Sequence, residues 1–136
     1  MINREEIFAK CGGRCAYCGC EITVKNFQVD HVLPKSRAHF ERELDNDRTD
    51  NLLPTCRKCN NFKGPYRLEE YRRELSLQVT RLRKNAQFDR ALRFGQVSIN
   101  ESPIVFHFEK CQHQAAESRP QPLTPAGVPE TQLSKE

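Results

Sequence analysis

The sequence predicts a small α+β domain. Two Cys-x-x-Cys pairs are separated by 37 residues, and short β-prone runs lie between them. Apolar residues at helical spacing follow the second pair. At 136 residues the chain suffices for one domain with a modest core. A bound metal is a common way of stabilising so small a unit.

The first element is a short helix over residues 3–10. Asn3 suits the N-cap position, and acidic residues fill the first turn after it. Gly12 and Gly13 follow and end the helix.

The segment between the two cysteine pairs contains both β-prone and polar stretches. β-prone residues occur at 22–24 and again at 27–29, which predicts two short strands. Residues 35–50 are polar, and we expect them to be irregular.

The region after the second cysteine pair is predicted to be helical first and β later. Residues 66–83 carry apolar residues at helical spacing: Leu68, Tyr71, Leu75, Val79 and Leu82. Of these, we expect Leu68, Tyr71, Leu75 and Leu82 to form a stripe that faces the core. A second helical piece is expected around residues 88–92. The runs QVSIN and PIVFHF predict a β-hairpin over residues 96–108. From residue 112 onward, Pro, Gln, Ser, Glu and Thr predominate, which predicts a disordered tail.

The composition favours a cytoplasmic protein. No apolar run approaches the length of a membrane span, and the N-terminal MINREEIFAK lacks the apolar centre of a secretory signal. Thiols stay reduced in the cytosol, so seven cysteines indicate metal ligands more than disulfides.

Charge is distributed unevenly along the chain. The net charge is +4, but residues 56–93 hold 11 Lys and Arg against 4 Asp and Glu. Residues 40–50 hold 2 basic against 5 acidic residues. A basic segment beside the cysteines suggests a polyanionic partner such as nucleic acid. On charge alone, a solvated Arg-rich helix face explains the pattern equally well.

The four paired cysteines are candidate zinc ligands. Cys15 and Cys18 can offer two thiolates from one tight turn, and Cys56 and Cys59 offer two more. A site closed by four sulfurs has no open position for water, so this zinc would be structural. A lone pair of this kind could instead be redox-active. No role follows for the remaining cysteines: Cys11, Cys20 and Cys111.

The order of motifs resembles a known family. Cys-x-x-Cys is followed by Asp30-His31 with Pro34 nearby, then by NLLPTC, CRKCN and a Lys-Gly pair. Over residues 13–64 this order resembles the HNH nucleases, in the variant in which the last His is replaced by Asn. The resemblance implies a ββα-metal active site.

The resemblance implies a role for each motif residue in phosphodiester hydrolysis. His31 would be the general base, and Asn51 would fix the loop that carries it. Asp30 and Asn60 would hold a catalytic Mg²⁺ or Mn²⁺, since such cations prefer oxygen ligands. Asn61 is the alternative to Asn60. The four cysteines would hold the β segment and the helix together.

Basic residues near these motifs are the expected contacts to nucleic acid. Lys63 is expected at a backbone phosphate, with Gly64 allowing the chain to turn. Arg57, Lys58 and Arg67 are further candidates. As a hypothesis, the helix after Gly64 extends this surface through its arginines: Arg67, Arg72, Arg73, Arg81 and Arg83.

Together these features predict a metal-dependent DNA endonuclease. The alternative is a zinc-binding nucleic-acid-binding module without catalysis. We expect a nuclease core over residues 1–64, a helical and hairpin extension over 65–111, and the tail over 112–136. RNA as substrate, and a monomer or a homodimer as the assembly, remain open at this point.

Overall fold

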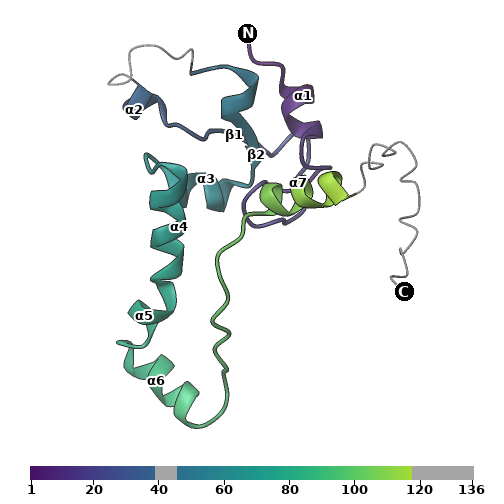
Figure 1. Ribbon diagram of the computed structural model, residues 1–136. Coiled ribbons are helices and arrows are strands. Elements are labelled where there is room, and N and C mark those ends of the chain that lie inside the picture. Colours follow the sequence, from purple (N-terminus) through teal and green to yellow (C-terminus); the bar gives the residue numbers. More distant parts are fainter. Residues whose placement is uncertain (39–45, 118–136) are drawn as a thin grey trace, which may run out of the picture.

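The computed structural model describes residues 1–38 and 46–117, and within them it confirms the α+β class (Figure 1). A two-stranded antiparallel sheet lies among short helices. The elements in chain order are α1 (Arg4–Ala9), β1 (Gln28–His31), α2 (Lys35–Ala38), the 3₁₀ turn η1 (Thr49–Asn51), β2 (Leu52–Thr55), α3 (Arg57–Lys63), α4 (Leu68–Ser76), α5 (Gln78–Leu82), α6 (Ala86–Arg93) and α7 (His107–Glu117).

The sheet pairs two segments that are distant in sequence. β1 lies antiparallel to β2, with Asp30 opposite Leu53 and His31 opposite Leu52. All four residues of β2 are buried, so the strand shows no alternation of apolar and polar positions. α3 begins directly after β2, where the sulfur of Cys56 accepts a hydrogen bond from the Cys59 amide at the helix start. The ββα order is therefore present.

Predictions for the N-terminal half are partly confirmed. α1 forms with Asn3 as its N-cap, and the run at 27–29 leads into β1. The prediction of a strand at 22–24 is wrong, because Thr23 and Asn26 bond each other's backbone amides in a tight turn. Within the segment expected to be irregular, residues 35–38 form the short helix α2.

An aromatic cluster forms the centre of the core. The ring centroid of Tyr17 lies 5.3 Å from that of Tyr71 and 5.0 Å from that of Phe106. These rings come from the first cysteine turn, from α4 and from the segment before α7. The C-terminal half is thus packed directly on the first cysteine turn.

The predicted β-hairpin at 96–108 is wrong. Residues 96–106 contain no strand, and α7 begins at His107. The alternating apolar residues instead place Phe106 in the core. Backbone amides at the start of α7 then bond Tyr17 and Ala16 carbonyls, and Glu109 accepts from the Phe106 amide. One segment therefore docks on the cysteine turn, and within residues 1–38 and 46–117 no strand pairs with it.

The predicted disordered tail begins too early. Residues 112–117 belong to α7. The rest of the predicted tail, residues 118–136, lies outside the described residues.

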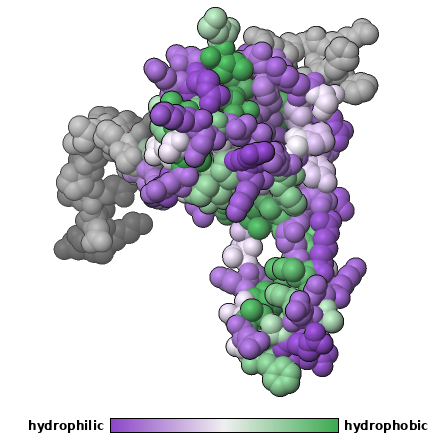
Figure 2. Space-filling model, turned by 180° about the vertical axis from the view of Figure 1, so that it is seen from behind, coloured by the Kyte–Doolittle hydropathy of each residue, from purple (hydrophilic) through white to green (hydrophobic). Residues whose placement is uncertain are grey.

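Helices α4 to α6 form an arm that projects from the core (Figure 1). The helix expected over 66–83 is divided at Leu77 into α4 and α5, and the piece expected around 88–92 is α6. Of the predicted stripe, Tyr71 is buried and Leu82 is exposed. Figure 2 shows apolar side chains on the surface of the arm. Phe94, which caps α6, and Val97 in the segment that follows are exposed. No helix in residues 1–38 and 46–117 has the length and apolar character to cross a bilayer.

Candidate metal centre and active-site groove

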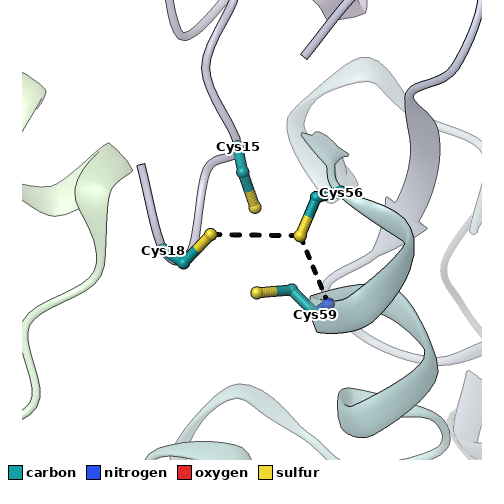
Figure 3. A group of neighbouring side chains, drawn as sticks. All are labelled: Cys15, Cys18, Cys56 and Cys59. Carbon is teal, nitrogen blue, oxygen red and sulfur yellow. Dashed lines mark hydrogen bonds between the residues drawn. The ribbon is translucent and has the colours of Figure 1, made fainter. Parts of the chain in front are cut away.

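The four paired cysteines converge on one point (Figure 3). The sulfur atoms of Cys15, Cys18, Cys56 and Cys59 all lie within 4.8 Å of one another. The sulfurs of Cys18 and Cys56 are 3.9 Å apart, and they come from different cysteine turns. Such a four-sulfur set has the composition and spacing to hold a zinc ion.

The surroundings of the cluster favour a thiolate. Cys15 is fully buried, yet hydrogen bonding from the Cys59 thiol and from nearby backbone amides lowers the pKa of Cys15 to about 4. The Cys59 thiol, as the donor in this pair, has its pKa raised. A metal cation would replace the shared proton and bring all four sulfurs to the thiolate form.

The other three cysteines lie outside this four-sulfur cluster. Burial raises the pKa of Cys11 to about 11, so its sulfur is an uncharged thiol. Cys111 lies 3.4 Å from the imidazole Nε2 of His107 on the same face of α7. Cys20 is exposed as a residue, but partial desolvation of its sulfur, together with hydrogen bonds to Cys18 and Cys56, raises the pKa of its thiol to about 12.

A groove of about 370 Å³ brings together the residues of the predicted active site. Asp30 and His31 from β1 and Asn60 from α3 all line it. Asn61, the alternative to Asn60, is exposed and is not among its lining residues. Carboxylate and amide oxygens are suitable donors for a hard divalent cation, so this donor set fits Mg²⁺ or Mn²⁺.

The carboxylate of Asp30 is buried and held by two side chains. The Tyr17 hydroxyl donates to one carboxylate oxygen at 2.6 Å, and the Lys63 ammonium lies 3.3 Å from each oxygen. Burial raises the pKa of Asp30, although Lys63 and Tyr17 oppose this effect. Tyr17 belongs to the first cysteine turn, so the sulfur cluster is connected to the groove through one hydrogen bond.

Lys63 is not placed to meet a phosphate, contrary to the prediction from sequence. Its side chain is fully buried, and its ammonium donates to the His31 carbonyl at 2.9 Å as well as to Asp30. Burial lowers the pKa of Lys63, and the attraction of Asp30 opposes this. Lys63 therefore joins α3 to β1 inside the protein. Gly64 ends α3 with a φ of 46°, a conformation that side chains rarely adopt.

The imidazole of His31 is largely enclosed at the end of β1. Its Nε2 atom lies 2.8 Å from a carboxylate oxygen of Asp47, and the Lys35 ammonium lies 3.3 Å from the same oxygen. Adjacent strand residues point to opposite faces, so the sequence predicts a bend that brings Asp30 and His31 to one site. Both residues remain within β1 and both border the groove.

Asn51 joins the segment after His31 to the segment before β2. Its side-chain oxygen accepts from the Leu33 amide at 2.8 Å, and its side-chain nitrogen donates to the carbonyls of Leu33 and Asn46. Its own carbonyl accepts from the Val32 amide. Asn51 thus contacts the loop that follows His31 and not the groove.

The side chains predicted to contact nucleic acid differ in how far they are exposed to solvent. Arg57, Lys58 and Arg67 are exposed, the first two at the start of α3. Arg72 is instead internal: it bonds Glu69, Glu109 and the Ile104 carbonyl, and it stacks 4.5 Å from the Phe106 ring centroid. It therefore holds α7 against α4.

The arginines at 81 and 83 are engaged in ion pairs. Arg81 pairs with Glu74 at 2.7 Å and Arg83 with Glu101 at 3.8 Å. Both remain about half exposed, so these pairs do not bury their charge. Arg73 is exposed on α4.

Comparison with known proteins gives the family of the region that contains the cluster and the groove. Residues 15–65 match the family model of the HNH endonuclease. These residues form an HNH endonuclease domain. The HNH domain comprises both cysteine pairs, the two strands and α3.

Two curated proteins are similar to this chain over nearly the same length as the HNH domain. The CRISPR-associated endonuclease Cas9 of Corynebacterium diphtheriae is 35% identical over 51 residues, which are 38% of this chain and 4% of that protein. The Septu protein PtuB of Bacillus thuringiensis is 38% identical over 55 residues, 39% of this chain and 20% of that protein. The chain thus spans a small part of the length of either relative.

Tyr17 and Asp47 are site residues that the sequence does not predict. Tyr17 lies between two cysteines, where any residue can stand without changing the spacing of ligands. Asp47 lies in a polar stretch rich in carboxylates, and no local pattern distinguishes it from its neighbours. Only the contacts of these two side chains identify them.

Proposed function

We propose that this protein is a metal-dependent DNA endonuclease that hydrolyses phosphodiester bonds in the groove between β1 and α3. The observation that carries the proposal is the shared groove of Asp30, His31 and Asn60 within an HNH endonuclease domain. Residues far apart in sequence line one concave surface there, and each has a chemical type that the reaction needs.

His31 acts as the general base in this proposal. An imidazole has a proton affinity suited to accepting a proton from water near neutral pH. The ring is partly exposed and borders the groove, so a water bound there can reach it. Asn51 positions the loop that follows His31 through its bonds to Leu33.

Asp30 and Asn60 would hold the catalytic cation. When bound, Mg²⁺ or Mn²⁺ supplies positive charge that polarises the phosphate and stabilises the leaving oxygen. Tyr17 and Lys63 fix the carboxylate of Asp30, so its direction toward the groove is set before any substrate arrives. The sulfur cluster would hold a structural Zn²⁺ that keeps the first cysteine turn against α3.

Exposed basic side chains would bind the phosphates of the substrate. Arg57 and Lys58 lie at the start of α3, and Arg67 lies just before α4. Arg73 adds an exposed charge on the arm. Contacts of this kind bind the backbone and do not read base sequence.

A non-catalytic nucleic-acid-binding module is the second candidate. The observation that favours it is the ion pair between Asp30 and Lys63, because a cation at Asp30 must share the carboxylate with a buried ammonium. A carboxylate has about four lone-pair positions, and the three contacts of Asp30 leave room for one further bond. A cation can therefore bind Asp30 without displacing Lys63, and catalysis is the first candidate.

Cleavage of supercoiled plasmid with Mg²⁺ or Mn²⁺ tests the proposal. We expect the wild-type protein to nick the plasmid, and His31→Ala to lower the rate by about 10²-fold or more. His113→Ala is the matched control, since His113 is exposed on α7 away from the groove residues. Zinc content and thermal melting of each variant show whether it is folded.

The outcomes separate the two candidates. Equal nicking by wild type and His31→Ala would exclude His31 as the base. Plasmid binding without nicking by the wild type, in either metal, would favour the non-catalytic module.

A further inference from the structure

The carboxylate of Asp47 contacts the imidazole of His31 at the end of β1. One carboxylate oxygen lies 2.8 Å from Nε2 of His31 and 3.3 Å from the Lys35 ammonium. The His31 side chain is 17% exposed and that of Asp47 is 49% exposed. Asp47 is therefore a surface carboxylate that lies against a largely enclosed ring.

This contact decides which ring nitrogen carries the proton. Hydrogen bonds from His31 and Lys35 hold the pKa of Asp47 below its usual value, so the side chain is ionised. An ionised carboxylate only accepts hydrogen bonds, and the facing Nε2 must therefore be the protonated nitrogen. In the neutral ring, Nδ1 then keeps its lone pair.

The free nitrogen is available to the groove. Within residues 1–38 and 46–117, Nδ1 of His31 makes no hydrogen bond, and His31 lines the same groove as Asp30 and Asn60. A ring without Asp47 could take either tautomer, and the form with a proton on Nδ1 cannot accept a second one there.

The segment that carries Asp47 is fixed to the segment that follows His31. The side chain of Asn46 donates to the Leu33 carbonyl at 2.8 Å, and Asn51 donates to the Asn46 carbonyl at 2.9 Å. Leu33 is in turn bonded by Asn51 through its amide. Asp47 is thus held opposite the ring by the bonds of its neighbour Asn46.

We propose that Asp47 is a positioning residue that holds His31 as the Nε2-protonated tautomer, so that Nδ1 is the atom that accepts the proton from water. The inference rests on the proposed function, since it assigns the proton-accepting atom of the same base. Asp47 itself touches neither the substrate nor the cation. Its effect is to orient the ring and to select its tautomer.

Nitrogen NMR of the imidazole tests the tautomer without any need for activity. The His31 signals are assigned by their absence in His31→Ala. We expect the wild-type ring to be protonated at Nε2, and Asp47→Ala to give a mixture of both tautomers. A wild-type ring protonated at Nδ1, or an Asp47→Ala spectrum identical to that of the wild type, would overturn the inference.

Plasmid cleavage tests the consequence. We expect Asp47→Ala and Asp47→Asn to lower kcat by about 10²-fold or more with little change in KM, since a base held in the wrong tautomer loses catalytic rate and not binding. Asp47→Glu should recover part of the rate. Asp50→Asn is the control, because Asp50 is an exposed carboxylate nearby that pairs with Arg48.

The two measurements keep the two proposals apart. An inactive wild-type protein with the expected tautomer would reject the endonuclease and keep the role of Asp47 in orienting His31. An active wild-type protein with equally active Asp47 variants would reject the positioning role and keep the endonuclease.

Discussion

At the scale of single residues, the ion pair between Lys63 and Asp30 matters for stability because both charges are buried. Lys63 is fully buried and Asp30 nearly so, and together with the His31 carbonyl they join α3 to β1. Buried charges are tolerated only when each has a partner, because water no longer solvates them. Removal of either partner leaves the other charge without compensation.

Lys63→Met should therefore destabilise the protein by about 3–5 kcal/mol, as is typical when one partner of a buried pair is removed. Urea denaturation followed by circular dichroism measures the change. Lys58→Met, on the exposed side of the same helix, should change the free energy of unfolding by no more than about 0.5 kcal/mol. The double variant Asp30→Asn with Lys63→Met should recover part of the stability. Equal midpoints for Lys63→Met and the wild type would contradict the role of this pair.

Tyr17→Phe should cost about 1.5–3 kcal/mol, because it removes a hydrogen bond to an ionised, buried carboxylate and leaves that carboxylate less satisfied. The same denaturation experiment measures it. Tyr66→Phe is a suitable comparison, since the Tyr66 hydroxyl makes no hydrogen bond within the described residues. A Tyr17→Phe protein as stable as Tyr66→Phe would show that the Tyr17 bond is not needed.

At the scale of elements, the sulfur cluster joins the first cysteine turn to the start of α3. That turn also supplies Tyr17 to the aromatic core and backbone carbonyls to the start of α7. Three parts of the chain therefore depend on the position of one turn. The sheet has two strands and cannot provide this stability alone.

One zinc ion per chain is the expected metal content, measured by atomic absorption. Cys59→Ser should lose the zinc and lower the melting temperature, and a strong chelator should do the same to the wild type, because metal-binding energy in so small a domain is also folding energy. Cys20→Ser tests specificity, since Cys20 lies beside the cluster but outside the four-sulfur set. Zinc loss from Cys20→Ser with retention in Cys59→Ser would reverse the assignment of ligands.

At the scale of the whole molecule, the arm of α4 to α6 projects away from the sheet and α3 (Figure 1), and it carries exposed basic side chains. Some of its charges serve the fold, as Arg72 does beneath α7. Others lie exposed, including Arg73, Lys84 and Arg90. Exposed cations of this kind bind polyanions in a salt-dependent way.

The triple variant Arg73→Ala, Lys84→Ala, Arg90→Ala should weaken DNA binding and reduce the slope of log affinity against log salt by up to about 3, which is one for each phosphate that the variant no longer binds. Fluorescence anisotropy with a short duplex at several salt concentrations measures the slope. The control replaces two exposed uncharged residues of the arm, Thr80 and Gln87, by alanine, which alters the arm but keeps every charge. An unchanged slope in the triple variant would show that the arm does not contact the phosphates.

Several features of this protein follow from sequence alone because their cause is local. The spacing within each cysteine pair places two thiols in one turn, and the order of motifs along residues 15–65 indicates an HNH domain and three residues of the groove, Asp30, His31 and Asn60. The N-cap at Asn3 is also local, since its bond reaches only three residues along the chain.

Tertiary structure decided whatever depends on a partner distant in sequence. Lys63 looks like a phosphate contact in the sequence, but Asp30 and the His31 carbonyl draw it inside. The alternation in PIVFHF looks like a strand, yet Phe106 enters the core and α7 follows. Asp47 meets the imidazole only where the fold brings it to His31. A charge or an apolar side chain has the same local pattern whether water or a buried partner surrounds it, so only the packed chain distinguishes the two.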